Sequence, residues 1–309
     1  MSVPALETHG LTKHYGRVKA VQGLDLAVEQ GQVFGFLGPN GAGKSTTMRM
    51  IMGLVRPTRG HALILGQPSA ATRSRAPGRI GALVEGPAFY GYLTARQNLT
   101  ALARLSGGVP AAEVDQALEL AGLGEAADRK VSGYSHGMRQ RLGVAQALLP
   151  RPRVLLLDEP SLGLDPQGRV EMRELLQRLN REAGVTIFLS SHLLGEVEQL
   201  CSHLAILAHG RLLQAGPTAR LLAGEAARVE LWATPVEGAE RVIGRLAPVR
   251  AVTRQGEALL FTCAPEDVAG VNAALVGAGI AVSALMPRPE NLEELYLRLM
   301  REAEHARGT

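Results

Sequence analysis

Short runs of apolar residues divide the first two thirds of the chain into predicted strands. The runs at residues 154–157 and 185–189 consist almost entirely of apolar and β-branched residues, which is typical of strands buried in a parallel sheet. A third run, at residues 33–37, leads through a glycine-rich stretch into a predicted helix at residues 46–54. Shorter β-like segments, many of them broken by glycines, cover residues 5–31, 61–65 and 80–84. The pattern predicts an α/β unit.

Between residues 94 and 149 the pattern becomes helical, with polar connections at residues 106–108 and 128–130. Because strands are predicted on both sides of this stretch, it indicates a helical subdomain inserted in the α/β unit at about residues 94–150. We expect the whole unit to form one domain over residues 5–224.

After about residue 225 the pattern changes and predicts a small accessory α+β domain over residues 225–309. Its predicted element order, βαββαβ, is typical of a ferredoxin-like fold. A last helix at residues 289–299 has apolar residues spaced by three and four and acidic residues at its start. This region carries no catalytic constellation. Its role therefore stays open among regulation, support of a dimer and plain stability. The predicted strands and helices cover residues 229–232, 236–246, 249–253, 258–263, 265–276 and 280–285.

The composition supports a soluble globular protein of two domains. The 309 residues are 46% hydrophobic and 20% charged, which is enough apolar material for a full α/β core. The net charge of +4 comes from scattered arginines, so we expect a solvated surface and no nucleic-acid partner. Cys201 and Cys263 lie far apart without metal-ligand spacing, and we expect buried, inert thiols.

The sequence carries no membrane or secretion signal that we recognise. Glycine or charged residues interrupt every apolar run before it reaches the roughly 18 residues that a membrane span needs. The first residues form neither a basic region nor an apolar one, as a secretory signal would require. We therefore expect a cytoplasmic protein, whose role at a membrane would need a separate partner.

The glycine-rich stretch after residue 37 is the strongest chemical signal in the chain. It fits the phosphate-binding pattern G-x-x-x-x-G-K-[ST] at every required position and lies between a predicted strand and a predicted helix. Such a loop aims backbone N–H groups and the positive end of the helix at one point, which suits a polyphosphate. We expect Lys44 to bridge the terminal phosphates of ATP and Ser45 to ligate Mg²⁺. The expected nucleotide-binding residues of the loop are Gly38, Pro39, Asn40, Gly41, Ala42, Gly43, Lys44, Ser45 and Thr46.

Two acidic residues follow the apolar run at residues 154–157. The carboxyl ends of parallel strands are where open α/β sheets place their ligands, so the acids are expected beside the phosphate loop. We predict that Asp158 holds the Mg²⁺ shell and that Glu159 polarises the attacking water. His192 follows the next strand and could bond to the terminal phosphate or the water, although a lone histidine there is more often structural. Tyr15, upstream of the loop, could stack on adenine or simply pack.

These motifs, in this order, resemble the nucleotide-binding subunit of an ATP-binding-cassette (ABC) transporter over about residues 5–222. The deciding stretch is residues 134–141, YSHGMRQR, at the place of the family signature LSGGQ, of which Ser135 and Gly137 match. The resemblance implies a phosphate-loop (P-loop) NTPase fold in which Ser135 and Gly137 contact nucleotide. It also implies that Tyr15 stacks on adenine, that His192 is the switch histidine and that residues 163–165 form the D-loop.

Glu85 departs from the family pattern, which usually has a glutamine at this position. A carboxylate is also an oxygen donor, so Glu85 is a further candidate ligand for Mg²⁺. Together with the phrase SSHLL at residues 190–194, it makes the chain similar to bacterial exporters of the antibiotic-resistance, bacitracin and daunorubicin type.

The resemblance implies an ATPase that powers a membrane exporter for a drug, antibiotic, peptide or lipid. Two copies, or one copy and a relative, are expected to close over two ATP molecules and to act on an integral-membrane permease. The protein would then lie on the inner face of the membrane. The alternative is a soluble ATPase of the same superfamily that acts on ribosomes or DNA. Such proteins usually carry two cassettes or long coiled coils, and this chain has one phosphate loop and no long heptad run.

Overall fold

The computed structural model describes residues 3–69, 80–105, 109–149, 151–223, 227–288 and 290–308. The chain divides into two compact units, one formed by Met1–Gly216 with Glu302–Thr309 and the other by Pro217–Arg301. The predicted domain boundary between residues 224 and 225 and the predicted connection at residues 106–108 lie outside the described residues. Each unit is described below by itself.

A six-stranded sheet forms the centre of the first unit, with the strand order β10-β9-β3-β8-β7-β6. The pairs β3–β8, β3–β9, β7–β8 and β6–β7 are parallel. This confirms the parallel sheet predicted for the runs at residues 154–157 and 185–189, whereas strand β9 was not predicted. Every residue of β3 and β8 is buried, since strands on both sides and layers on both faces exclude water. The strands are β3 (Val33–Leu37), β6 (Ile80–Leu83), β7 (Val154–Asp158), β8 (Thr186–Ser191), β9 (His203–Ala208) and β10 (Arg211–Pro217).

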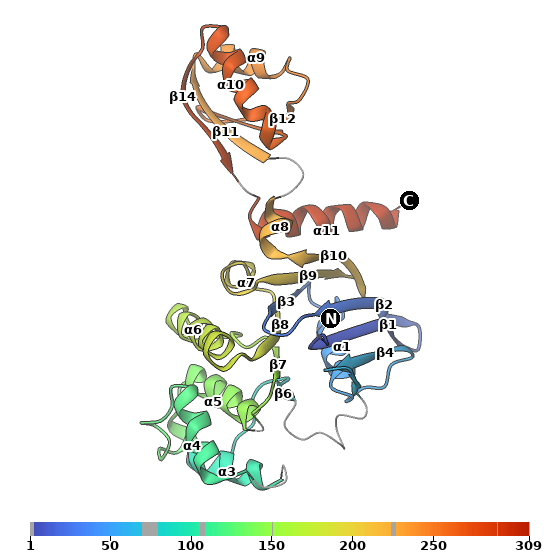
Figure 1. Ribbon diagram of the computed structural model, residues 1–309, viewed down its shortest axis with the longest axis vertical. Coiled ribbons are helices and arrows are strands. Elements are labelled where there is room, and N and C mark those ends of the chain that lie inside the picture. The colour runs from blue at the N-terminus through green and yellow to red at the C-terminus, as the bar shows by residue number, and fades with distance from the viewer. Residues whose placement is uncertain are drawn as a thin grey trace. The chain divides into compact units, whose positions relative to one another are not determined.

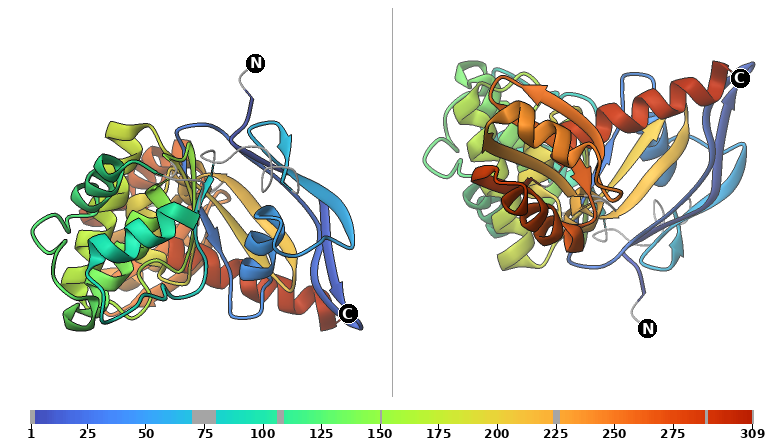
Figure 2. Two further views of the ribbon diagram at one scale, coloured as in Figure 1. Left: turned by 90° about the horizontal axis from the view of Figure 1, so that it is seen from below. Right: turned by 90° about the horizontal axis from the view of Figure 1, so that it is seen from above.

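A second sheet, antiparallel and of order β2-β1-β4-β5, lies on the other side of helix α1 (Lys44–Ile51) (Figures 1 and 2). Helix α1 contacts β2, β4 and β7, so both sheets share one core around Met48, Met50 and Ile51. The helix starts two residues before the predicted position, at Lys44, and its regular turns end before Gly53, which has a left-handed φ of +68°. The strands are β1 (Leu6–Tyr15), β2 (Val18–Val28), β4 (Arg59–Ile64) and β5 (Gln67–Pro68).

The predicted helical subdomain contains α3 (Ala95–Leu105), α4 (Ala111–Leu120), the short helix η1 (Val131–Gly133) and α5 (His136–Leu148). The three long helices contact one another, and α5 packs against β6 of the central sheet (Figure 1). The approach is close at Gly81, where an added Cβ would lie 1.9 Å from the Ala147 carbonyl oxygen. The polar connection predicted at residues 128–130 lies between helices, as expected.

Strands β7 and β8 lead through polar residues into helices α6 and α7. Helix α6 (Pro166–Ala183) starts at an Asp165 cap, whose Oδ1 accepts from the Gly168 N–H at 2.7 Å. Helix α7 (Leu194–Leu200) follows β8 after His192. Helix α8 (Thr218–Ala223) belongs to the second unit.

The second unit contains an antiparallel sheet of order β12-β13-β11-β14, and helices α9 and α10 pack against it. The observed element order, β11-α9-β12-β13-α10-β14, is the order predicted for residues 229–285, and the ferredoxin-like assignment stays a prediction. The helices cover a core that includes Leu231, Ile243, Phe261 and Leu275. The elements are β11 (Ala227–Thr234), α9 (Val236–Ile243), β12 (Arg250–Gln255), β13 (Ala258–Cys263), η2 (Pro265–Asp267), α10 (Val268–Gly277) and β14 (Ala281–Arg288).

The last described element is α11 (Leu292–Gly308), capped by Asn291, whose Oδ1 accepts from the Glu294 N–H at 2.9 Å. The predicted start of this helix at residue 289 lies outside the described residues. Among the described residues, no helix is both long enough and apolar enough to cross a membrane. Cys201 and Cys263 are buried thiols outside any disulfide, and burial raises the pKa of both.

Candidate functional site

The phosphate loop connects β3 to α1 and is held in place by close backbone contacts that only glycine permits. A Cβ added at Gly38 would lie 2.6 Å from the Leu207 carbonyl oxygen, and one at Gly43 would lie 2.4 Å from the Ala20 carbonyl oxygen. Gly43 has a φ of +105° and Gly41 has a φ of +80°, both in the region that favours glycine. The glycine pattern is therefore a requirement of the loop conformation.

The amino-terminal end of α1 is open to an anion. Within the described residues, Gly43 provides no side-chain cap, and the first turn holds no acidic residue that would satisfy the helix dipole. Beside it lies Lys44, only 7% exposed, whose Nζ donates to the Gly38 carbonyl oxygen at 2.7 Å. Burial lowers the pKa of Lys44 from its ordinary value of 10.5, an effect that the nearby charges of Glu159 and Asp158 oppose.

The acids predicted from the sequence lie at the same edge of the sheet as the loop. Glu159 Oε1 is 3.9 Å from Lys44 Nζ, and Glu159 Oε2 is 2.7 Å from His192 Nδ1. Asp158 is the last residue of β7, and its Oδ1 accepts from the Ser190 hydroxyl at 2.5 Å. Glu159 has a left-handed φ of +50°, a strained conformation for a residue with a side chain. The structure thus brings Lys44, Glu159 and His192 together in one row of polar contacts.

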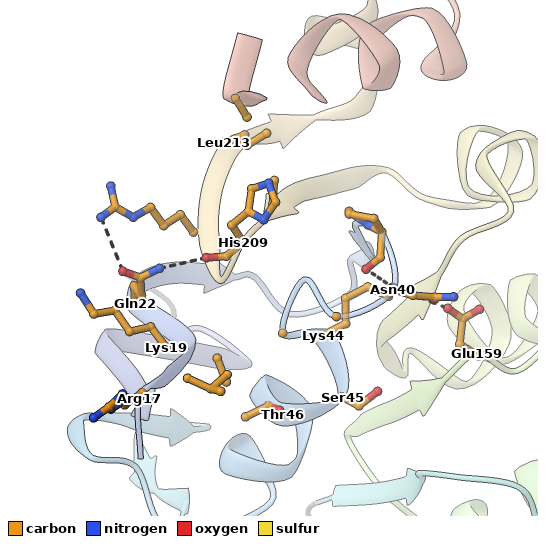
Figure 3. A pocket seen from close by; sticks show the side chains of 18 residues that line it. Arg17, Lys19, Gln22, Asn40, Lys44, Ser45, Thr46, Glu159, His209 and Leu213 are labelled. Carbon is orange, nitrogen blue, oxygen red and sulfur yellow. Dashed lines mark hydrogen bonds and ion pairs between the residues drawn. The ribbon is translucent and has the colours of Figure 1, made fainter. Parts of the chain in front are cut away.

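A pocket of about 1000 Å³ opens over the loop, a volume that suits a nucleotide (Figure 3). Its wall carries four basic side chains and one carboxylate, a balance that favours a polyphosphate ligand. Asn40, Lys44, Ser45, Thr46 and Glu159 were predicted from the sequence. The residues that sequence reasoning missed include Arg17, Val18, Lys19, Gln22, His209 and Arg211.

The missed residues lie at the start of β2 and at the end of the β9–β10 connection, from Arg17 to Gln22 and from His209 to Arg211, and hydrogen bonds join these two segments. Gln22 Nε2 donates to the His209 carbonyl oxygen at 2.9 Å, and the Gln22 N–H donates to the Gly210 carbonyl oxygen at 2.7 Å. The Gly210 N–H in turn donates to the Ala42 carbonyl oxygen of the phosphate loop at 3.0 Å. An added Cβ at Gly210 would lie 2.6 Å from the Ala20 carbonyl oxygen. No motif in the sequence marks these residues. The glycine at position 210 is the one sequence feature among them that indicates a close approach of two backbone segments.

Tyr15, the expected adenine-stacking residue, is the last residue of β1 and is 48% exposed. Lys13 Nζ lies 4.9 Å from the centre of its ring. The residues that line the pocket include Arg17 and Val18 and do not include Tyr15. Its stacking role stays a prediction.

Glu85 follows β6 and is exposed, with a left-handed φ of +66°. Its carboxylate forms an ion pair with the guanidinium of Arg49, in the last turn of α1. This pairing connects the loop after β6 to the helix that carries the phosphate loop. A role of Glu85 as a metal ligand stays a prediction.

Ser135 and Gly137 lie at the start of α5 and are not among the residues that line the pocket. The Ser135 hydroxyl caps this helix by accepting from the Met138 N–H at 3.2 Å. His136, which replaces a family glycine, has its Nε2 at 2.9 Å from the Leu162 carbonyl oxygen. This contact joins the signature stretch to Leu162, which directly precedes the residues predicted to form the D-loop.

The donor set beside Lys44 fits Mg²⁺. The cation prefers one or two protein oxygen ligands together with substrate phosphates and water, and Asp158 and Ser45 are such donors. Within the described residues, no cluster of three or more His, Cys, Asp or Glu side chains forms a complete metal cage.

Comparison with known proteins gives the family. The family described as ABC transporter matches residues 21–162. The bacitracin transport ATP-binding protein BcrA of Bacillus licheniformis is 47% identical over 212 residues, 69% of each chain. The protein of the same name from Enterococcus faecalis is 34% identical over 295 residues, 96% of each chain. The chain belongs to the ABC transporter family.

A solved structure supports the same assignment. The structure of cbiO1 from Clostridium perfringens, described as part of the ABC transporter complex cbiONQ, has a TM-score of 0.65 and 26% identity. It covers 79% of this chain, and this chain covers 96% of it. Membership of the ABC transporter family makes the protein an ATPase that binds nucleotide, and it confirms the P-loop NTPase cassette predicted from the sequence.

Proposed function

We propose that this ATPase works by the row of side chains Lys44, Glu159 and His192 at the carboxyl edge of the sheet. Lys44 bridges the terminal phosphates, where its buried charge is worth more than in water. Glu159 accepts a proton from the attacking water, and His192 orients its carboxylate through the 2.7 Å contact. This contact, beside an anion-binding loop, is the observation that carries the proposal.

Mg²⁺ is held in this proposal by the Ser45 hydroxyl and the Asp158 carboxylate. When bound, the cation supplies positive charge against the negative charge that develops on the transferred phosphoryl group. Glu85 is a third candidate oxygen donor, and its ion pair with Arg49 competes with that role. Tyr15 is retained as the candidate for stacking on adenine.

Two copies, or one copy and a relative, are proposed to close over two ATP molecules. Ser135 and Gly137 of one copy would then contact the nucleotide held by the phosphate loop of the other. Two observations support this: both residues lie at a helix start, and neither lines the pocket of its own chain.

The protein is proposed to power export of an antibiotic or a similar drug, peptide or lipid through an integral-membrane permease. Two relatives that are named for bacitracin transport support the cargo class, and one of them aligns over 96% of the chain. Attachment to such a permease would hold the protein at the inner face of the membrane. The relatives named here favour this function over the alternative of a soluble ATPase acting on ribosomes or DNA.

The exporter role is tested by isolating tagged protein from detergent-solubilised host membranes and identifying what is bound by mass spectrometry. We expect a stoichiometric polytopic membrane protein that lacks a phosphate loop. A Lys44→Ala variant serves as the control for binding that depends on the nucleotide state. Recovery of ribosomal or DNA-processing proteins without a membrane protein would overturn the exporter and leave the ATPase intact.

A further inference from the structure

We propose that Ser190 is a positioning residue that sets the orientation of both acids of the site. Its hydroxyl donates to Asp158 Oδ1 at 2.5 Å and accepts from the Glu159 N–H at 3.0 Å. Ser190 itself is completely buried. A single hydroxyl thus contacts the side chain of one acid and the backbone of the next.

The position of Ser190 within the sheet limits the hydrogen-bond partners of its hydroxyl. Strand β8 lies between β3 and β7, where Ser190 stands opposite Phe36 on one side and Asp158 on the other. Phe188, two residues earlier on the same face of the strand, is fully buried against Phe36. A hydroxyl buried in such surroundings is costly unless it is bonded, and its two bonds go to the two acids.

The bond to Asp158 fixes the plane of a carboxylate that we propose as a ligand of Mg²⁺. Partners of this kind, which bond to a metal ligand rather than to the metal, typically change metal affinity or activity 10–100-fold when they are removed. The charged acceptor makes the bond stronger than one between neutral groups. Ser190 therefore acts on the cation through Asp158.

The bond to Glu159 holds a strained turn. Glu159 has a φ of +50°, which residues with side chains rarely adopt. Its N–H points at both the carbonyl oxygen and the hydroxyl of Ser190, at 3.2 and 3.0 Å. His192, two residues after Ser190, bonds to the carboxylate of Glu159. The end of β8 thus fixes Glu159 at its backbone and at its side chain, which aims the carboxylate at the phosphate loop.

The inference rests on the proposed roles of Asp158 and Glu159, and the variant Ser190→Ala tests it. We expect the half-saturating Mg²⁺ concentration for ATP hydrolysis to rise, or kcat to fall. The product of the two changes is expected to be about 10–100-fold. Binding of a fluorescent ATP analogue in EDTA is expected to stay within about twofold of wild type, because phosphate contacts to the loop are unchanged. The gain in analogue affinity on adding Mg²⁺ is expected to shrink, a readout that does not depend on turnover.

Thr186→Val is the matched control. Thr186 begins the same strand, is 2% exposed, and uses its hydroxyl to accept from the Gly31 N–H at 2.9 Å, far along the strand from the acids. Loss of that hydroxyl is expected to lower thermal stability and to leave the Mg²⁺ response unchanged. If Ser190→Ala does not fold, Ser190→Cys keeps the volume with a weaker donor and is expected to give an intermediate Mg²⁺ response.

The results separate this inference from the function on which it rests. A Ser190→Ala protein with the Mg²⁺ response and kcat of Thr186→Val would overturn the role of Ser190, provided that Glu159→Gln is inactive. A fully active Glu159→Gln protein would instead overturn the proposed role of Glu159 whatever Ser190 does. A reduced Mg²⁺ response in Ser190→Ala with intact binding in EDTA would establish the positioning role.

Discussion

Replacing Glu159 with glutamine is the most direct test of the proposed chemistry, because it removes a charge and almost no volume. The amide keeps an oxygen near His192, so the turn after β7 is expected to persist. The ion pair with Lys44, at 3.9 Å, is lost; two unit charges at that distance attract by about 4 kcal/mol at an effective dielectric constant of 20, before the cost of desolvation. Lys44 is then freer to bind phosphate, so ATP affinity is expected to stay the same or to rise.

Turnover is expected to fall steeply in the same variant. A carboxylate base typically contributes 10²–10⁴-fold to the rate, which corresponds to about 3–5 kcal/mol of barrier. The assay is phosphate release at saturating Mg²⁺ and ATP, together with binding of a fluorescent ATP analogue. Size-exclusion chromatography with ATP is expected to show a long-lived dimer, because the nucleotide is bound and not hydrolysed.

The matched control is Glu113→Gln, which removes a carboxylate from an ion pair with Arg151 in the helical subdomain. It is expected to hydrolyse ATP at the wild-type rate. If Glu159→Gln also retains wild-type turnover while binding ATP normally, the reasoning that makes Glu159 the base is wrong.

Three further predictions follow from the same geometry. His192→Ala should lower kcat by about tenfold or more with little change in ATP affinity, because its 2.7 Å contact orients Glu159 and not the loop; steady-state kinetics beside His203→Ala, whose histidine contacts Gln32 and Ser202, would check this. Gly43→Ala should weaken ATP binding far more than Gly41→Ala, since only the former places a Cβ within 2.4 Å of a backbone oxygen while both have positive φ; titration with a fluorescent ATP analogue distinguishes them. Lys44 binds its proton less tightly in the folded state than in the unfolded state, so its contribution to stability should rise as the pH increases from the lowered pKa toward 10.5. The free energy of unfolding of wild type should therefore rise over that range relative to that of Lys44→Met. A constant difference between the two proteins would contradict the lowered pKa.

The central sheet and the loop were predictable because their signals are local. A parallel strand buried on both faces must be apolar along its length, so residues 154–157 and 185–189 could be assigned from composition alone. Gly38 and Gly43 are required by contacts with Leu207 and Ala20 that no sequence pattern shows, yet the loop motif already contains them. The ends of helix α1 were placed less well, because Gly43 and Gly53 set them through backbone conformation.

The basic wall of the pocket was not predictable, because it is assembled from distant segments. Arg17, Lys19 and Gln22 come from the start of β2 and the residue before it. His209 and Arg211 come from the turn before β10 and its first residue, and 189 positions separate Gln22 from Arg211. Lysines and arginines are common on surfaces, so none of these residues stands out in the sequence. The turn at Gly210 brings the two segments together, because it bonds both to Gln22 and to Ala42 of the phosphate loop.

The same principle explains why the sequence assigns no role to the Ser190 hydroxyl and includes Ser190 only in the phrase SSHLL at residues 190–194. Its role depends on the register of β8 against β7, which sets it opposite Asp158, and on the strained turn that follows. An apolar residue would suit the buried position better if packing alone mattered, since the fully buried Phe36 stands opposite it and the fully buried Phe188 lies two residues earlier on β8. A serine at this point is therefore best explained by what its hydroxyl bonds to, and the Mg²⁺ response of Ser190→Ala measures how much of the site depends on those bonds.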